Sequence, residues 1–188
     1  IQQEKGINAF IKAWLKVHQP TDRLVVAGRS VDGAYFQEFE DLVAQAKGAI
    51  SYFGYLERDR VLDLLAASHF LVLPSGLEEE GGMRENFGNV VAEAMAVGRP
   101  VLVAKGLAWD QLESLGAGFV FERNEASVCA ALAKAQALDS SEWKQMSLIG
   151  RLYVEQELDP IKLGDKVWQV LKKPDQASTP STKQGFIL

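Results

Sequence analysis

Two glutamates, Glu85 and Glu93, carry the strongest chemical pattern in this 188-residue sequence. Eight residues of helix rise about 12 Å, so the two carboxylates are too far apart to share one proton. They could instead bracket a diphosphate, with Glu85 meeting a sugar hydroxyl and Glu93 meeting a second hydroxylated ring two turns further along. For Glu85 alone, the alternative is a first-turn glutamate that the helix dipole favours.

A helix is expected to begin near Asn86 or Phe87, between the two glutamates. A helix start combines free N–H groups with a positive dipole end, and Gly88 would let an anion approach the backbone closely. We predict that this anion is a phosphate. Glu93 follows in an otherwise apolar stretch, where a carboxylate needs a partner, so it is either a ligand-binding group or a solvent-facing helix carboxylate.

Short apolar runs alternate with amphipathic segments and predict the scaffold for these residues. Strands are expected at 23–27, 49–53, 69–73, 100–104 and 118–122. Helices are expected at 4–18, 34–47, 58–67, 87–97 and 109–115, and three more at 125–138, 140–156 and 160–172. Aliphatic strands that alternate with helices are typical of a parallel sheet covered on both faces. The predicted fold class is therefore α/β, a doubly wound, mostly parallel Rossmann-like sheet with extra C-terminal helices.

Ligands of such sheets bind beyond the carboxyl ends of the strands, which here precede the loops 28–33, 54–58, 74–86 and 105–109. The third of these loops leads into the glutamate pair. It also contains Glu78-Glu79-Glu80, for which a solvated acidic loop is favoured over a metal site, so no metal is expected.

Composition excludes several classes of protein. The chain has 20 Lys and Arg against 25 Asp and Glu, a net charge of −5, and no basic run. Binding of nucleic acid or anionic lipid across a broad face is therefore not expected. No apolar run reaches the roughly 18 residues that cross a bilayer, and a single cysteine, Cys129, fits a reducing compartment. We expect a cytoplasmic protein without a transmembrane segment.

The domain organisation follows from shifts in composition. Residues 1–172 are expected to form one domain, and 173–188, rich in Pro, Ser, Thr, Gln and Lys, a flexible tail. The sequence starts without Met on a segment that is already helical in pattern, so we expect it to begin partway through a longer polypeptide.

Several motifs together resemble a known family. They are Lys5-Gly6 before an amphipathic helix, a strand that ends in Gly28, Phe53-Gly54-Tyr55-Leu56, Pro74-Ser75, and Glu85-Asn-Phe-Gly-Asn-Val-Val-Ala-Glu93-Ala-Met-Ala-Val-Gly-Arg-Pro100. From Lys5 to about Leu171 the chain resembles the carboxyl-terminal, donor-binding domain of the retaining group 1 glycosyltransferases, which have the two-domain GT-B fold and a Glu-x7-Glu motif.

The resemblance implies roles for these residues in a nucleotide-sugar site. Glu85 and Lys5 would be the catalytic pair: Glu85 would lie against the donor sugar, and Lys5 would neutralise the diphosphate leaving group. Glu93 would bind the ribose, the amides of Phe87, Gly88 and Asn89 the sugar hydroxyls or diphosphate, and the loop at Tyr55 and Leu56 the base. The full donor-binding set implied is Glu93, Asn86, Phe87, Gly88, Asn89, Gly28, Arg29, Tyr55 and Leu56.

The resemblance further implies an enzyme that transfers a hexosyl unit from a UDP- or GDP-sugar to a glycan or lipid-linked acceptor, in polysaccharide or lipopolysaccharide synthesis. No cofactor other than this donor substrate is implied. The acceptor site would belong to an amino-terminal domain that this chain lacks, so the isolated half should transfer no sugar. The full-length protein would be cytoplasmic, or peripheral at the inner face of the membrane.

Two features depart from the family pattern, and two other functions stay open. The segment from Gly76 to Arg84 is longer than usual, and an arginine that often precedes the lysine would fall before Ile1. A receiver-like signalling module has a similar five-stranded sheet, but its third strand should end in an acceptor Asp, where this chain has Pro74-Ser75. A nucleotide-sugar epimerase would keep the fold and change the chemistry.

Overall fold

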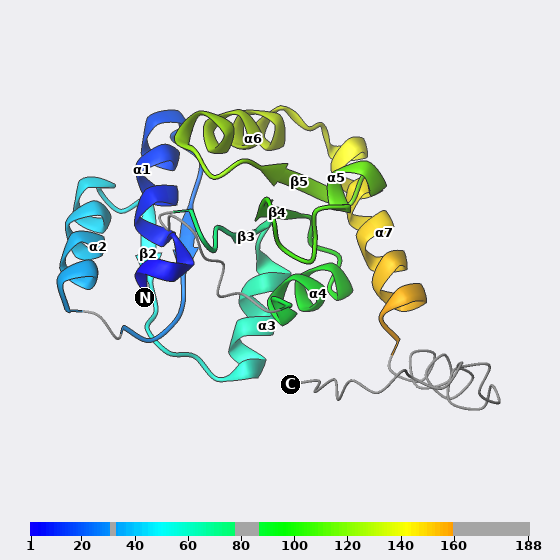
Figure 1. Ribbon diagram of the computed structural model, residues 1–188, viewed down its shortest axis with the longest axis horizontal. Helices are drawn as coiled ribbons and strands as arrows, with labels where there is room; N and C mark the ends of the chain where they lie inside the picture. The colour runs from blue at the N-terminus through cyan, green and yellow to red at the C-terminus, as the bar shows by residue number, and fades with distance from the viewer. Residues whose placement is uncertain (31–32, 78–86, 160–188) are drawn as a thin grey trace, which may run out of the picture.

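The computed structural model describes residues 1–30, 33–77 and 87–159 of the chain (Figure 1). Strands alternate with helices along most of this length, as the sequence pattern predicts. The strands are β1 (Leu24–Val26), β2 (Ile50–Tyr52), β3 (Leu71–Leu73), β4 (Val101–Ala104) and β5 (Gly118–Phe121). The helices are the 3-10 helix η1 (Gln3–Lys5), α1 (Ile7–Val17), α2 (Gly33–Gln45), α3 (Arg58–Ala67), α4 (Asn89–Ala96), α5 (Leu112–Leu115), α6 (Glu125–Ala137) and α7 (Ser140–Glu157). The helix expected at 160–172 and the tail at 173–188 lie outside the described residues.

All strand pairs in the described part of the chain are parallel, but they form two groups. Strands β1 and β2 pair with each other, with Leu24 opposite Ile50. Strand β4 lies between β3 and β5, with Val101 opposite both Leu71 and Gly118. The predicted strands are thus present and parallel, yet hydrogen bonding divides them into a two-stranded and a three-stranded sheet.

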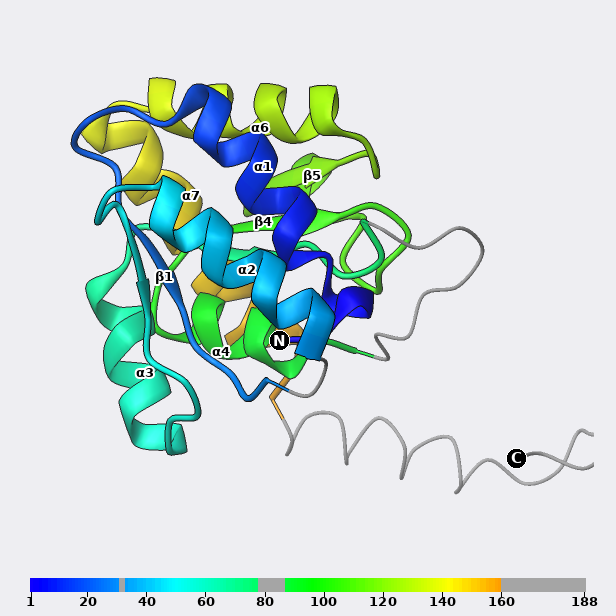
Figure 2. The ribbon, with the colours of Figure 1, turned by 90° about the vertical axis from the view of Figure 1, so that its left-hand side faces the viewer.

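Helices cover both faces of the strands, as Figures 1 and 2 show from two directions. On one face α1 packs between α2 and α6, and α6 also contacts β5. On the other face α4 contacts β3 and β4 and packs against α3 and α7. This arrangement confirms the predicted doubly wound α/β architecture.

The hydrophobic core is centred on β4. All four residues of this strand are buried, and Leu102 retains only 1% exposure. Strand β1 differs, because Val25 keeps 40% of its surface exposed. The prediction that the run at 23–27 is covered on both faces is therefore wrong. Since β1 pairs only with β2 among the described residues, it sits outside the three-stranded sheet whose central strand, β4, is fully buried.

No helix within the described ranges is both long and apolar enough to cross a bilayer.

Candidate functional site

Lys5 is held at the carboxyl end of β3 by backbone contacts on both sides of it. The amide of Gly76 donates to the carbonyl oxygen of Glu4 at 2.8 Å. Gly6 has a left-handed φ of 64°, and a Cβ built on it would lie 2.3 Å from the carbonyl oxygen of Pro74. Glycine is required here, because any side chain would push the Lys5 segment away from the loop that follows β3.

The start of α4 differs from the prediction. The helix begins at Asn89, not near Asn86 or Phe87, because Gly88 adopts φ 68° and ψ 60° and caps it. Because Gly88 is left-handed, the helix cannot extend back to Phe87, which lies ahead of α4 with 41% of its surface exposed. The amides of Gly88 and Asn89 donate to no group in the described part of the chain, so free amides do occur at this helix start, two residues beyond Phe87. Glu85 and Asn86 lie outside the described residues.

Trp109, in the loop after β4, braces the approach to α4. Its ring is 1% exposed, and its indole N–H donates to the carbonyl oxygen of Phe87. The two rings also pack, with centroids 4.7 Å apart and an interplanar angle of 48°. Sequence reasoning missed this hydrogen bond, whose signal is a tryptophan in a loop at the same sheet edge as the α4 start.

Glu93 projects from the middle of α4 toward the start of α3. Its Oε1 lies 3.0 Å from a guanidinium nitrogen of Arg58, the first residue of α3. The Glu93 side chain is 27% exposed and that of Arg58 is 76% exposed. The expected partner for this carboxylate therefore exists within the protein, and Arg58 is a residue that sequence reasoning missed.

The loops after β1 and β2 are joined to each other. The amide of Gly28 donates to the carbonyl oxygen of Gly54 at 2.7 Å, and the Tyr52 hydroxyl donates to the carbonyl oxygen of Gly28 at 2.8 Å. The Arg29 guanidinium carbon lies 4.2 Å from the ring centroid of Tyr55. This stacking holds a cation over an aromatic ring that remains 54% exposed.

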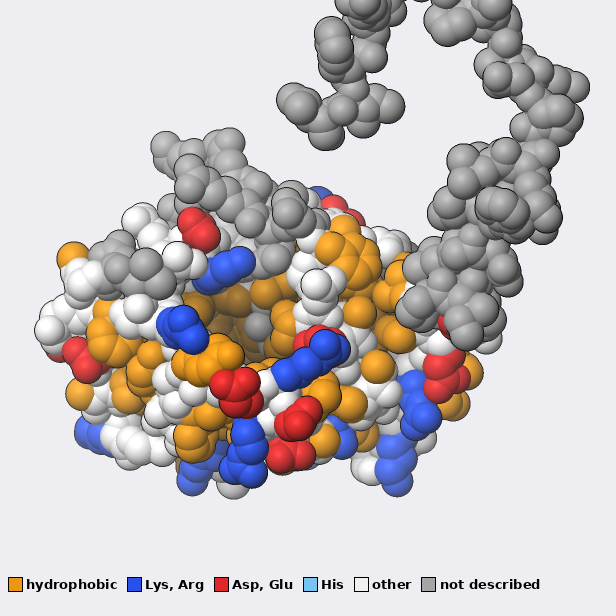
Figure 3. Space-filling model, turned by 90° about the horizontal axis from the view of Figure 1, so that it is seen from below, with side chains coloured by type: hydrophobic (Ala, Val, Ile, Leu, Met, Phe, Trp, Pro, Cys, Tyr) orange, Lys and Arg blue, Asp and Glu red, His pale blue; other side chains and the backbone are white. Residues whose placement is uncertain are grey.

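The candidate residues thus form three groups at the carboxyl ends of the strands. Gly28, Arg29, Tyr55 and the half-buried Leu56 lie in the joined loops after β1 and β2, and Glu93 faces the helix that follows. Phe87, Gly88 and Asn89 form the braced start of α4, and Lys5 ends η1, which is bound to the loop after β3. Figure 3 shows a hollow on this side of the molecule, with hydrophobic side chains on its walls and Lys or Arg side chains at its rim.

No group of three or more His, Cys, Asp and Glu side chains in the described ranges is arranged to hold a metal ion. The acidic run at Glu78-Glu79-Glu80 lies outside these ranges.

The fold is a parallel α/β domain with candidate ligand-binding groups at its strand ends, and a protein family with these features matches the sequence. Residues 1–149 match the model of the glycosyl transferases group 1 family. The chain belongs to this family. Membership removes the receiver-like module as an alternative, because that module is a different class of protein.

Individual relatives refine this placement. The chain is 25% identical over 170 residues to a GDP-mannose-dependent monoacylated alpha-(1-6)-phosphatidylinositol monomannoside mannosyltransferase of Corynebacterium glutamicum. The match covers 89% of this chain and 44% of that protein. The chain therefore spans less than half the length of this curated relative.

Solved structures share the fold. HepE from Anabaena, crystallised with UDP, matches with a TM-score of 0.76 at 21% identity, covering 90% of this chain and 46% of HepE. The C-terminal domain of the group 1 glycosyl transferase LpcC from Francisella tularensis matches with a TM-score of 0.73 at 23% identity, covering 85% of this chain and 83% of that domain. The chain thus has the fold of a C-terminal domain of this family.

Proposed function

We propose that this chain is the nucleotide-sugar-binding half of a glycosyltransferase. The observation that carries the proposal is the placement of Glu93, a partly buried carboxylate whose only ion-pair partner among the described residues is the exposed Arg58. A carboxylate held this way can exchange an exposed cation for the two hydroxyls of a ribose at little cost. Its partner Arg58 begins the helix after the β2 loop, and the braced start of α4 lies one helical turn before it.

The proposed donor lies across the strand ends in an extended form. The base rests against the loop at Tyr55 and Leu56, where backbone groups can meet its polar edge. The ribose reaches Glu93, and the diphosphate meets the free amides ahead of α4 together with Lys5. In the family pattern Glu85 lies against the sugar.

Charge stabilisation is the proposed catalytic contribution of this half. As the glycosidic bond to the diphosphate breaks, negative charge grows on the departing phosphate oxygens. Lys5 and the amides of Gly88 and Asn89 would stabilise that charge from fixed positions. Gly6 and Trp109 hold these groups, so little reorganisation is needed when the reaction occurs.

Several finer properties belong to the same proposal. The transfer retains the anomeric configuration, and a leaving-group oxygen takes the acceptor proton, as the resemblance to the family implies. The acceptor is a glycan or a lipid-linked molecule bound through a separate amino-terminal domain, so the chain alone transfers no sugar. No metal or cofactor is needed, and the full-length enzyme works in the cytoplasm or at the inner membrane surface.

The base of the donor is either uracil or guanine. The Corynebacterium relative uses GDP-mannose, and HepE was crystallised with UDP-glucose, so relatives support both. An epimerase half would bind the same nucleotides, but the match to a transferase family favours sugar transfer.

Calorimetric titration of the chain with UDP, GDP and ADP tests the proposal. We expect UDP or GDP to bind, ADP not to bind, and Glu93→Ala to abolish the binding. Glu40→Ala, which removes an exposed glutamate from α2, is the matched control and should bind as the parent does. Failure of a folded chain to bind any nucleotide, or undiminished binding by Glu93→Ala, would contradict the proposal.

A further inference from the structure

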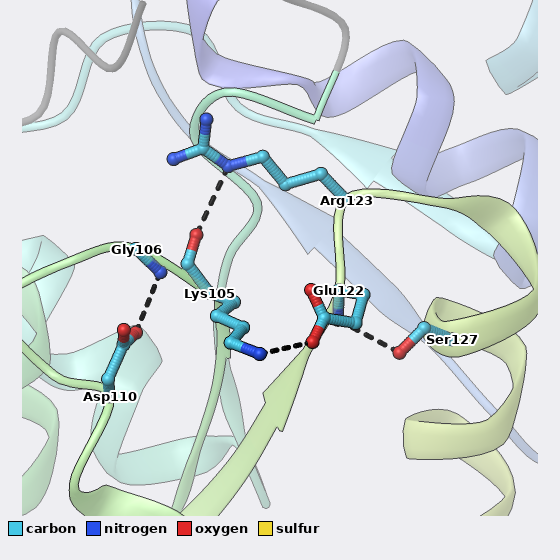
Figure 4. Close-up of polar contacts among 6 residues, drawn as sticks. All are labelled: Lys105, Gly106, Asp110, Glu122, Arg123 and Ser127. Atoms are coloured by element: carbon cyan, nitrogen blue, oxygen red, sulfur yellow. Dashed lines mark hydrogen bonds and ion pairs between the residues drawn. The ribbon is translucent and has the colours of Figure 1, made fainter.

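Arg123 is a cation at the carboxyl end of β5 to which the proposed function has so far assigned no role. It lies two residues beyond the end of that strand, and its Nε donates to the carbonyl oxygen of Lys105 at 3.1 Å (Figure 4). This bond directs the side chain back across the sheet edge, toward the loops that follow β4 and β3.

Two glycines make room for the Arg123 guanidinium. A Cβ on Gly76 would lie 3.1 Å from the guanidinium carbon and 3.2 Å from Nη1, and a Cβ on Gly106 would lie 3.2 Å from Nη2. Gly76 and Gly106 have left-handed φ values of 80° and 88°, so both are tight turns at the carboxyl ends of neighbouring strands. The planar fork of Arg123 therefore spans two turns, and neither turn offers its Nη groups an acceptor.

The carboxylates around Arg123 are already engaged by other groups. Glu122 pairs with Lys105, and that hydrogen bond raises the pKa of the lysine. Asp110 accepts from the amide of Gly106 at 2.8 Å. Within the ranges the structure describes, no carboxylate lies within ion-pair distance of Arg123, and neither Nη group donates a hydrogen bond.

This arrangement differs from an ordinary exposed arginine. A free arginine side chain loses conformational entropy when a ligand fixes it. Here the Nε bond and the packing on two turns fix the side chain before any ligand arrives. A guanidinium held in one orientation with both Nη groups open is suited to a two-point contact with an oxyanion.

The position of Arg123 relates it to the proposed donor site. Gly76, on which its guanidinium packs, donates its amide to Glu4, next to Lys5. Arg123 approaches this loop from the β5 side, and β5 lies across the molecule from β2, whose loop is proposed to hold the base (Figure 1). The guanidinium therefore borders the diphosphate region on the side away from the base.

We propose that Arg123 binds a phosphate oxyanion at the carboxyl edge of β3, β4 and β5. The proposal extends the proposed function to a second charged contact beyond Lys5. The oxyanion is supplied either by the donor's own diphosphate or by a phosphate on the acceptor. Both sources present the same chemistry to the guanidinium fork.

The experiment follows the Arg123 side chain directly. Inorganic phosphate is titrated into the chain with 15N-labelled arginine, and the Nε–Hε resonances are recorded by NMR. The Arg123 signal should shift with saturation, and Arg123→Gln should weaken phosphate binding about tenfold or more, as expected for loss of a charged hydrogen-bonded pair. Arg123→Lys keeps the charge but not the planar fork, so its phosphate affinity should lie between those of the parent and Arg123→Gln.

Arg151→Gln is the control, because Arg151 pairs with Glu155 on α7 and should leave phosphate affinity unchanged. Melting temperatures of all variants show whether any change reflects loss of the fold. An unmoved Arg123 resonance, or equal phosphate affinity in Arg123→Gln and the parent, overturns the proposal.

Competition separates the two sources of the oxyanion. If UDP or GDP displaces phosphate from Arg123, the site takes the donor diphosphate. If phosphate and nucleotide bind together, the site takes an anion of another substrate. Phosphate binding is measured without nucleotide, so the two proposals fail separately. Loss of phosphate binding with intact nucleotide binding overturns only the role of Arg123, and loss of nucleotide binding with intact phosphate binding overturns only the proposed function.

Discussion

Glu93→Gln is the substitution that tests the proposed nucleotide site most sharply. Glutamine keeps the size of the side chain and removes the negative charge. In the free protein one carboxylate oxygen is held by Arg58 at 3.0 Å, and the Arg58 side chain is 76% exposed. An ion pair this exposed contributes at most about 1 kcal/mol, so releasing Glu93 to a ribose is inexpensive.

The expected loss follows from the hydrogen bonds that Glu93 would make. Hydrogen bonds to a charged group contribute about 1.5–3 kcal/mol, and the carboxylate can accept from both ribose hydroxyls. After allowing for its partial exposure of 27%, we expect Glu93→Gln to cost about 2–3 kcal/mol of nucleotide binding. This corresponds to a dissociation constant weakened about 30- to 150-fold.

The assay compares ribonucleotides with nucleotides that lack the hydroxyls. The parent chain should bind the preferred nucleoside diphosphate more tightly than its 2′,3′-dideoxy analogue, and Glu93→Gln should bind the two about equally. Arg58→Ala serves as a companion and should change ribonucleotide affinity less than about fivefold, because it removes only the exposed partner. Equal weakening of both nucleotides by Glu93→Gln would refute the ribose contact.

Three further predictions concern the groups that hold the site and the fold. Trp109→Phe removes the indole N–H and leaves a carbonyl ahead of α4 without its donor, so denaturant unfolding should show a loss of about 1–3 kcal/mol together with weaker nucleotide binding. Gly6→Ala puts a Cβ 2.3 Å from the Pro74 carbonyl oxygen, and should lower the melting temperature by several degrees, whereas Gly33→Ala, with open space at its Cβ, should not. The hydrogen bond from Lys12 lowers the pKa of Glu38. The charged carboxylate therefore stabilises the fold above its unfolded-state pKa, and this stabilisation is lost as the pH falls through the folded-state pKa. Glu38→Gln should lower the free energy of unfolding by about 0.5 kcal/mol at neutral pH and by almost nothing at about pH 3, as measured by urea titration.

The order and type of the elements could be predicted because each is encoded locally. Short runs of aliphatic residues mark the parallel strands, and the predicted strand at 100–104 matches β4 closely. The start of α4 was misplaced because Gly88 reads equally well as a helix residue or as a left-handed cap. Only the backbone conformation separates those two cases.

The contacts that build the site could not be predicted in the same way. Arg58 and Glu93 belong to different helices, and Trp109 reaches Phe87 from another loop. Nothing near either residue in the sequence indicates its partner, because the pairing depends on how the helices pack on the strands. The type of each residue suggested a role, and the topology determined which residue it meets.

Charge at the strand ends shows what this topology achieves. Arg29 follows β1, Arg58 begins the helix after β2, the Lys5 segment is bound to the loop after β3, Lys105 follows β4, and Arg123 follows β5. In sequence these cations are dispersed through a chain of net charge −5, with no basic run. Because the carboxyl ends of parallel strands meet at one edge, folding collects these cations there, beside the carboxylates of Glu93 and Glu122 that pair with Arg58 and Lys105. An anionic ligand that reaches this edge would therefore meet several cations at once, although the molecule as a whole carries a net charge of −5, and their attraction acts only within about 10 Å at ordinary salt.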